Sequence, residues 1–202
     1  GAAPMEIENA LTKFLRLKQI CGTPAAIKFE DGEPHPDQSA KLDVACEKIE
    51  EICVENNEHL IVFTQFRGVQ AALVERLKHK RFKNVPVYQL HGDVPASDRP
   101  ATVKRWAGDE PGVIVCMLQV AGVGLNMTKA NKQIFLDKLF VPKLNEQAQD
   151  RSHRIGADTT QPVQIIELIC RNTIESRVEQ ILALGAHVAH TGAEHLTAHL
   201  AG

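Results

Sequence analysis

The 202-residue sequence has little of what marks several common protein classes. Aromatic residues make up only 4% of the chain, which disfavours a surface that stacks single-stranded bases. No apolar run approaches the ~18 residues of a membrane-spanning helix, and no secretory signal is visible. The formal net charge of −2 excludes a basic field over the whole surface. We therefore expect no membrane partner, although a few donors in a cleft could still contact DNA phosphates.

The chain also lacks paired metal-binding motifs. Its five cysteines are scattered and form no Cys-x-x-Cys pair: Cys21, Cys46, Cys53, Cys116 and Cys170. Such spacing is typical of a reducing compartment, so we expect an intracellular protein. The location would be the cytoplasm or nucleoid in a prokaryote or virus, and the nucleus in a eukaryote. Four histidines follow between 187 and 199, but a frayed terminus explains them as well as a metal site does, and we expect no metal.

Hydrophobic periodicity predicts strands that alternate with helices. An apolar stripe predicts a helix over 6–20 that ends before Pro24, and a loop with two prolines follows over 30–37. Buried strands are expected at 59–64, 87–90, 113–118, 133–137 and 163–168. Further helices are expected at 39–52, 69–77, 97–108 and from 172 onward. Ser97 is the expected cap of the third of these, and a capping box at 172–175 is the expected start of the fourth. This alternation predicts an α/β domain with a mostly parallel sheet covered on both faces.

Three parts are expected along the chain. Residues 1–38 form a lead-in helix and linker, 39–170 the α/β lobe, and 171–202 a terminal bracing helix and tail. Ligands of parallel sheets bind at the carboxyl ends of the strands, so the segments after the strands are the places to look for function.

The segment from Gln147 to Gly156 is the richest in chemistry. Arg151 and Arg154 are three residues apart, which places both guanidiniums on one face if the segment is helical. Two such donors suit phosphate oxygens, as in an arginine finger. An exposed helical turn in which Arg151 pairs with Asp150 or Glu146 fits the same spacing, so spacing alone leaves both readings open.

A glycine pair follows the third expected strand. Gly122 and Gly124 would let the backbone approach a ligand closely. A tight turn from strand to helix explains the pair equally well.

Together these segments resemble the late motifs of the Swi/Snf-type ATPases, a branch of helicase superfamily two. The similar segments are Leu11 to Pro24, Val62 to Phe66, the block with Tyr88, Leu90, Gly92, Arg99 and Trp106, Ala121 to Asn126 followed by Asp137 and Pro142, Gln147 to Gly156, Pro162-Val163, and Thr173 to Glu175. The resemblance spans about residues 10 to 182 in the family's order and implies a RecA-like C-terminal motor lobe. The last arginine-containing motif is its most specific part.

The resemblance implies roles at single positions. Arg154 would be the principal arginine finger, with Arg151 beside it. Gln147 would organise the nucleotide interface, and Gly122 and Gly124 would bring the backbone near the nucleotide. The implied contacts to the phosphates of double-stranded DNA are Gln65, Arg67, Gly92, Arg99 and Gln119. Such contacts position a protein without reading sequence.

Some positions depart from the family pattern. Leu118 stands where many relatives carry a threonine that contacts DNA, which puts one strand contact in doubt. Phe140-Val141-Pro142 replaces Trp-Asn-Pro, and Ala157 replaces a glutamine. We expect altered coupling at these positions and unchanged chemistry.

The chain lacks Gly-x-x-x-x-Gly-Lys-[Ser/Thr], the cradle for ATP phosphates, and has no acidic box suited to magnesium. We therefore expect ATP with magnesium to be held mainly by an N-terminal motor lobe of the same protein, and the isolated lobe to be an inactive part of an ATP hydrolase. The start at Gly1 is expected to mark an expression fragment. Two alternatives are a non-catalytic DNA- or protein-binding module and an RNA helicase lobe.

Overall fold

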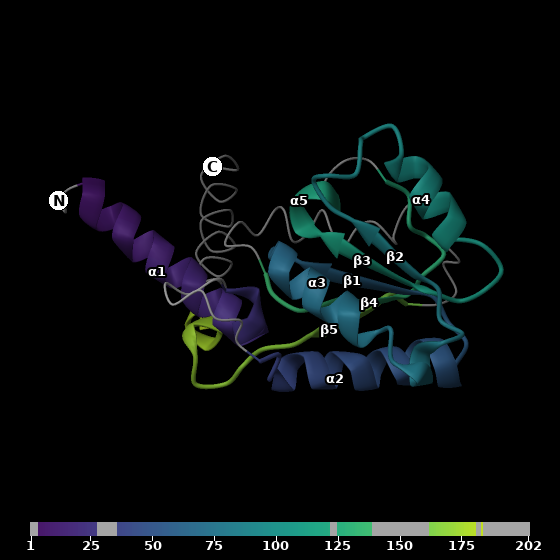
Figure 1. Ribbon diagram of the computed structural model, residues 1–202, viewed down its shortest axis with the longest axis horizontal. Coiled ribbons are helices and arrows are strands. Elements are labelled where there is room, and N and C mark those ends of the chain that lie inside the picture. The colour runs from purple at the N-terminus through teal and green to yellow at the C-terminus, as the bar shows by residue number, and fades with distance from the viewer. Residues whose placement is uncertain (1–3, 28–35, 122–124, 139–161, 181–182, 184–202) are drawn as a thin grey trace, which may run out of the picture.

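The computed structural model describes residues 4–27, 36–121, 125–138, 162–180 and 183. Figure 1 shows a twisted sheet with helices packed on both sides and a long first helix that runs out from the body. The strands are β1 (Leu60–Thr64), β2 (Val87–Leu90), β3 (Val113–Met117), β4 (Lys132–Phe135) and β5 (Gln164–Glu167). The helices are α1 (Pro4–Gly22), α2 (Ala40–Ile49), α3 (Arg67–Arg76), α4 (Arg99–Trp106) and α5 (Leu118–Ala121), and residues 174–180 are also helical. Short helical segments are η1 (Pro24–Ala26), η2 (Glu50–Glu55) and η3 (Lys80–Phe82).

The five strands lie in the order β2-β3-β1-β4-β5, and every pairing is parallel. The expected parallel sheet is therefore confirmed. After β1 the chain crosses to β2, on the side of the sheet that holds β3. After β4 it crosses to β5, in the opposite direction along the sheet. This reversal creates a topological switch point between the carboxyl ends of β1 and β4, where open parallel sheets bind their ligands.

Alternating side chains of the central strands feed two separate cores. In β1, Leu60 and Val62 pack toward α2 and α3, whereas Ile61 and Phe63 pack toward α4. Because both faces are covered, all five residues of β1 are buried and the strand is a continuous apolar run. Trp106 of α4 is fully buried, and its indole N–H donates to the Gly112 carbonyl over 2.9 Å. Its expected role as a core anchor is confirmed.

The first helix joins the lobe through close backbone packing at its C-terminal end. A Cβ at Gly22 would lie 2.5 Å from a methyl group of Val69, and a Cβ at Gly68 would lie 2.8 Å from the Ala26 Cβ. Side chains at either glycine would push α1 and η1 off α3. The lead-in segment is thus seated directly on the helix that follows β1.

A buried ion pair joins α2 to the helix at 174–180. The Lys41 ammonium lies 2.5 Å and 2.7 Å from the two carboxylate oxygens of Glu175 and also donates to the Leu136 carbonyl over 2.6 Å. The Lys41 and Glu175 side chains are 1% and 7% exposed. A glutamate oxygen also accepts from the Cys170 backbone N–H over 2.9 Å.

Two expected helix starts were wrong in detail. Ser97 does not cap α4: the N-cap is Asp98, which makes no side-chain cap bond, and the Ser97 hydroxyl donates to the Asp98 carboxylate. At the last described helix, Thr173 accepts from the Glu175 N–H, whereas Asn172 adopts a positive φ of 60°. Glu175 has turned to Lys41 and Cys170 instead of completing a capping box. In addition, β3 ends at Met117, one residue before the expected end.

None of the helices within the described ranges has the length and apolar character needed to cross a membrane.

We expect Lys41→Ala to lower the free energy of unfolding by about 3–5 kcal/mol, because it leaves the Glu175 carboxylate buried without its cation. Urea unfolding followed by circular dichroism measures the change. Lys48→Ala is the matched control, since its ion pair with Glu51 is exposed and is worth at most about 1 kcal/mol. Replacing both partners, as Lys41→Met with Glu175→Leu, should recover most of the loss. A Lys41→Ala loss no larger than that of Lys48→Ala would contradict the prediction.

Candidate functional site

The five expected phosphate contacts all lie after the carboxyl ends of strands in one half of the sheet. They are Gln65 and Arg67 after β1, Gly92 and Arg99 after β2, and Gln119 in α5 after β3. Arg67, Gly92 and Gln119 are exposed, and Gln65 and Arg99 are half-buried. The parallel order brings these ends to one edge, so the five residues share an edge although 54 positions separate the first and the last in sequence.

The ends of β1 and β2 are joined by a polar cluster around Arg67. Its guanidinium donates to the Gln70 amide oxygen over 2.7 Å, lies 3.2 Å from His91 Nε2 and lies 3.9 Å from the Asp93 carboxylate. Gln70 is fully buried, and its amide N–H groups donate to the carbonyls of Leu90 and Val115. A buried amide anchored on two strands thus orients an exposed guanidinium at the sheet edge.

The arginine also fixes the state of His91. A guanidinium can only donate, so Nε2 of His91 must accept, which places the imidazole proton on Nδ1. That nitrogen lies 3.4 Å from the Asp93 carboxylate. Burial, followed by the positive charge of Arg67, holds the pKa of His91 below its ordinary value, while Asp93 opposes the shift. The cluster therefore favours the neutral form of His91.

The other two residues of this half are placed differently. A Cβ at Gly92 would meet nothing within 4 Å, so space alone does not require glycine there. Arg99 directs its Nε–H to the Val94 carbonyl over 3.0 Å and so braces the loop between β2 and α4.

A second polar cluster lies at the switch point between β1 and β4. The Asp137 carboxylate accepts from the Thr64 hydroxyl over 2.5 Å and from the Gln65 backbone N–H over 3.0 Å. The Gln65 side chain donates to the Lys138 carbonyl over 3.0 Å. Asp137 is buried, so its two bonds lock the turn out of β1 to the end of β4. Gln65 is thereby positioned by both its backbone and its side chain.

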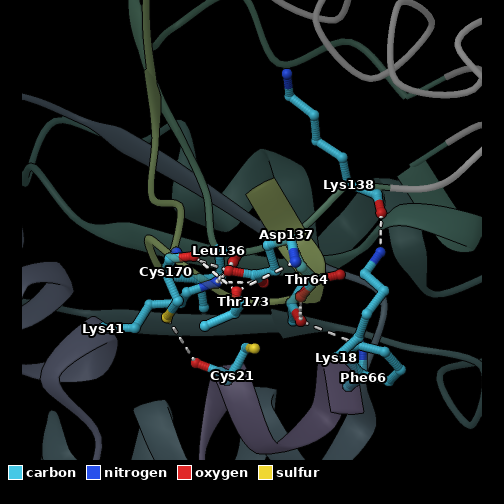
Figure 2. Close-up of polar contacts among 12 residues, drawn as sticks. Lys18, Cys21, Lys41, Thr64, Phe66, Leu136, Asp137, Lys138, Cys170 and Thr173 are labelled. Carbon is cyan, nitrogen blue, oxygen red and sulfur yellow. Dashed lines mark hydrogen bonds and ion pairs between the residues drawn. The ribbon is translucent and has the colours of Figure 1, made fainter. Parts of the chain in front are cut away.

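Sequence reasoning missed the contribution of the lead-in helix to this cluster. Lys18 of α1 is 2% exposed, and its ammonium donates to the same Lys138 carbonyl (Figure 2). Burial lowers the pKa of Lys18, while Asp137 and Glu175 raise it in part. Lys18 lies seven residues after Leu11, which places it on the apolar stripe of the helix, but a charged residue usually indicates exposure, and the pairing partner lies 120 residues away. The register of Lys18 on this stripe is the signal that could have identified it.

The remaining expected site residues lie outside the described residues. They are Arg151, Arg154 and Gln147 of the arginine segment, and Gly122 and Gly124 of the glycine pair. The departures at 140–142 and 157 and the histidine-rich tail also lie outside them.

We expect two variants to move the pKa of His91 in opposite directions. Arg67→Ala removes a neighbouring cation and should raise it, whereas Asp93→Asn removes an anion and should lower it further. NMR titration of the His91 ring measures both, and shifts in the same direction would contradict the cluster.

Because the folded pKa of His91 lies below the ordinary value of 6.5, the stability linked to His91 is present above about pH 6.5 and is lost as the pH falls through the folded pKa.

The model of the helicase conserved C-terminal domain family matches residues 40–156, more than half of the chain. A candidate ATP-dependent helicase/translocase of Bacillus subtilis (strain 168), YwqA, is 34% identical over 173 residues, which are 85% of this chain and 18% of that protein. The chain thus spans less than a fifth of this curated relative.

Solved structures give the same picture. The Sulfolobus solfataricus SWI2/SNF2 ATPase core in complex with dsDNA is similar with a TM-score of 0.73 and 30% identity, over 91% of this chain and 37% of that chain. The C-terminal part of the Fun30 ATPase domain is similar with a TM-score of 0.65 and 26% identity, over 82% of this chain and 53% of that chain. The parallel sheet and its flanking helices match these lobes, which confirms the RecA-like fold and the Swi/Snf resemblance. The chain belongs to the helicase conserved C-terminal domain family, as a C-terminal lobe of the Swi/Snf type.

Proposed function

We propose that this chain is the second motor lobe of an ATP-dependent translocase on double-stranded DNA and that it does not hydrolyse ATP alone. The observation that carries the proposal is the gathering of Gln65, Arg67, Gly92, Arg99 and Gln119 at one carboxyl edge of a sheet whose fold matches a DNA-bound Swi/Snf ATPase core. The relatives are much longer than this chain, which leaves room for a first lobe.

On the nucleotide side, the chain would contribute arginines. Arg154, with Arg151 beside it, would stabilise negative charge on the transferring phosphoryl group, and Gln147, Gly122 and Gly124 would line the interface. The first lobe would hold ATP and magnesium, because this chain lacks the phosphate-binding glycine-lysine loop. Arginine fingers act on a nucleotide bound by another domain, so division of the site between two lobes explains why the arginines occur without the loop.

On the DNA side, the exposed edge would contact phosphates. Arg67 supports this role most directly, because its side chain is 47% exposed while its guanidinium is hydrogen-bonded to the buried amide of Gln70. Its partner Asp93 is 84% exposed and 3.9 Å away, so a phosphate can replace it at little cost. Phosphate contacts carry no sequence information, which suits a motor that steps along any sequence.

In the protein that joins a first lobe to this chain, Arg154→Ala should lower DNA-stimulated ATP hydrolysis by about 10³-fold or more, the scale of a lost arginine finger. Steady-state hydrolysis with and without duplex DNA measures this, and the isolated chain should be silent. Arg105→Ala, an exposed arginine of α4, is the matched control and should retain activity. An active Arg154 variant would make the binding-module alternative the better one, and stimulation by RNA in place of DNA would favour an RNA helicase lobe.

We further expect Arg67→Gln to weaken binding of duplex DNA equally for all sequences. The slope of log binding constant against log salt concentration should fall by about one, because one phosphate contact is lost. Fluorescence anisotropy over a salt series measures the slope. Lys83→Gln is the control, since this exposed lysine lies just before β2, at the amino-terminal edge of the sheet. Equal slopes for both variants would remove Arg67 from the DNA interface.

A further inference from the structure

Two cysteines that are distant in sequence meet where α1 joins the segment after β5. The Cys170 sulfur lies 3.4 Å from the Cys21 carbonyl oxygen, although 149 residues separate the two in sequence. Both sulfur atoms and a carboxylate oxygen of Glu175 lie within 4.8 Å of one another. Figure 2 shows the two side chains on facing segments beside the Lys41 and Asp137 clusters. Both cysteines are free and partly exposed, so small reagents can reach them.

The surroundings distinguish the two thiols. A hydrogen bond from Cys170 lowers the pKa of Cys21 to about 6, with burial opposing and the Thr173 side chain assisting. Because Cys170 donates this hydrogen bond, the bond, followed by burial, raises the pKa of Cys170. The charged groups that face Cys21 are the Glu175 carboxylate, which raises its pKa, and the Lys41 ammonium, which lowers it, and Lys18 lies near enough to sense its charge. The surroundings therefore favour the thiolate form of Cys21 and the thiol form of Cys170.

Two thiols and a carboxylate could also suggest a metal site, but the carboxylate is already bound. Both oxygens of Glu175 accept from the Lys41 ammonium, and one accepts from the Cys170 backbone N–H. A buried cation 2.5 Å from the carboxylate also repels a metal ion. The arrangement thus favours sulfur chemistry between the two cysteines.

We propose that Cys21 and Cys170 form a redox-active dithiol that peroxides oxidise to a disulfide. The Cys21 thiolate attacks a peroxide oxygen, so an S–O bond forms, the O–O bond breaks, and hydroxide leaves and is protonated to water. The Cys170 sulfur then attacks the sulfur of the Cys21 sulfenic acid. An S–S bond forms, the S–O bond breaks, and the hydroxyl group leaves with the Cys170 proton as a second water. Two electrons pass from the thiols to the peroxide.

The other three cysteines provide an internal comparison. Cys46, Cys53 and Cys116 are buried, and burial raises the pKa of each, that of Cys53 to about 12. Oxidation should therefore be confined to the pair at α1. The disulfide would tie the last turn of α1 to the segment after β5, which requires neither ATP nor DNA and does not rest on the proposed function.

The test uses the reduced 202-residue chain treated with hydrogen peroxide. Peptide mass spectrometry under non-reducing conditions should find Cys21 linked to Cys170, and the number of titratable thiols under denaturing conditions should fall from five to three. In untreated protein at pH 7, iodoacetamide should label Cys21 at least about tenfold faster than any buried cysteine, with a midpoint near pH 6.

Two variants separate the roles. In Cys170→Ala, oxidation should stop at a Cys21 sulfenic acid that a dimedone reagent traps, and the pH midpoint of labelling should rise because the hydrogen-bond donor is gone. In Cys21→Ser, neither a disulfide nor a sulfenic acid should form at Cys170. Absence of the linked peptide in folded, oxidised wild-type protein overturns the proposal. Stoichiometric protection of both thiols by zinc, with no disulfide on peroxide treatment, would replace it with a metal site.

Discussion

The structure depends on how one buried ammonium, that of Lys41, is satisfied without water. A lysine with a side chain that is 1% exposed must find acceptors inside the protein, and it finds the two oxygens of Glu175 and the carbonyl of Leu136. These acceptors come from the helix at 174–180 and from the residue after β4. The ion pair therefore holds α2, this helix and the end of β4 together. Such a pair contributes little net stability against an apolar substitute, but leaving one half unpaired is costly. Its main effect is therefore to fix geometry.

The position of the end of β4, which Lys41 fixes, also affects the candidate site. Leu136, which Lys41 binds, precedes Asp137, which binds both Thr64 and Gln65. The turn out of β1 is thus held by the end of β4, and the end of β4 is held by α2. At the neighbouring strand end the same logic recurs on a smaller scale, where buried Gln70 joins two strands and orients exposed Arg67. In both places a buried polar group, Asp137 or Gln70, is hydrogen-bonded within the protein and holds a long polar residue, Gln65 or Arg67, in one position. A phosphate site requires such fixed donors.

The sequence predicted the sheet because its signal is local. Every expected strand exists within two residues at either end, since a strand buried on both faces is an apolar run that a short window detects. The edge that carries Gln65 and Arg67 followed from the parallel order alone. The pairs that fix this edge could not be predicted in the same way, because Lys41 and Glu175 are 134 residues apart and charged residues usually indicate exposure. The cap at Ser97 failed for another reason, because the helix begins one residue later than expected and Asp98 occupies the N-cap position.

The first helix, α1, is attached beside the carboxyl ends of β1 and β4. Of its described side chains, Leu15, Leu17 and Ile20 are 38%, 48% and 41% exposed, whereas Lys18 is buried against the Lys138 carbonyl. These three apolar side chains therefore do not attach the helix to the lobe, and the described contacts of Lys18 and Gly22 lie in its last two turns. Any displacement of α1 reaches the lobe beside Asp137, at the switch point between β1 and β4. If the lobe works as the second half of a motor, the segment that leads into it and Gln65, one of the residues that would contact DNA, share the Lys138 carbonyl as their hydrogen-bond acceptor.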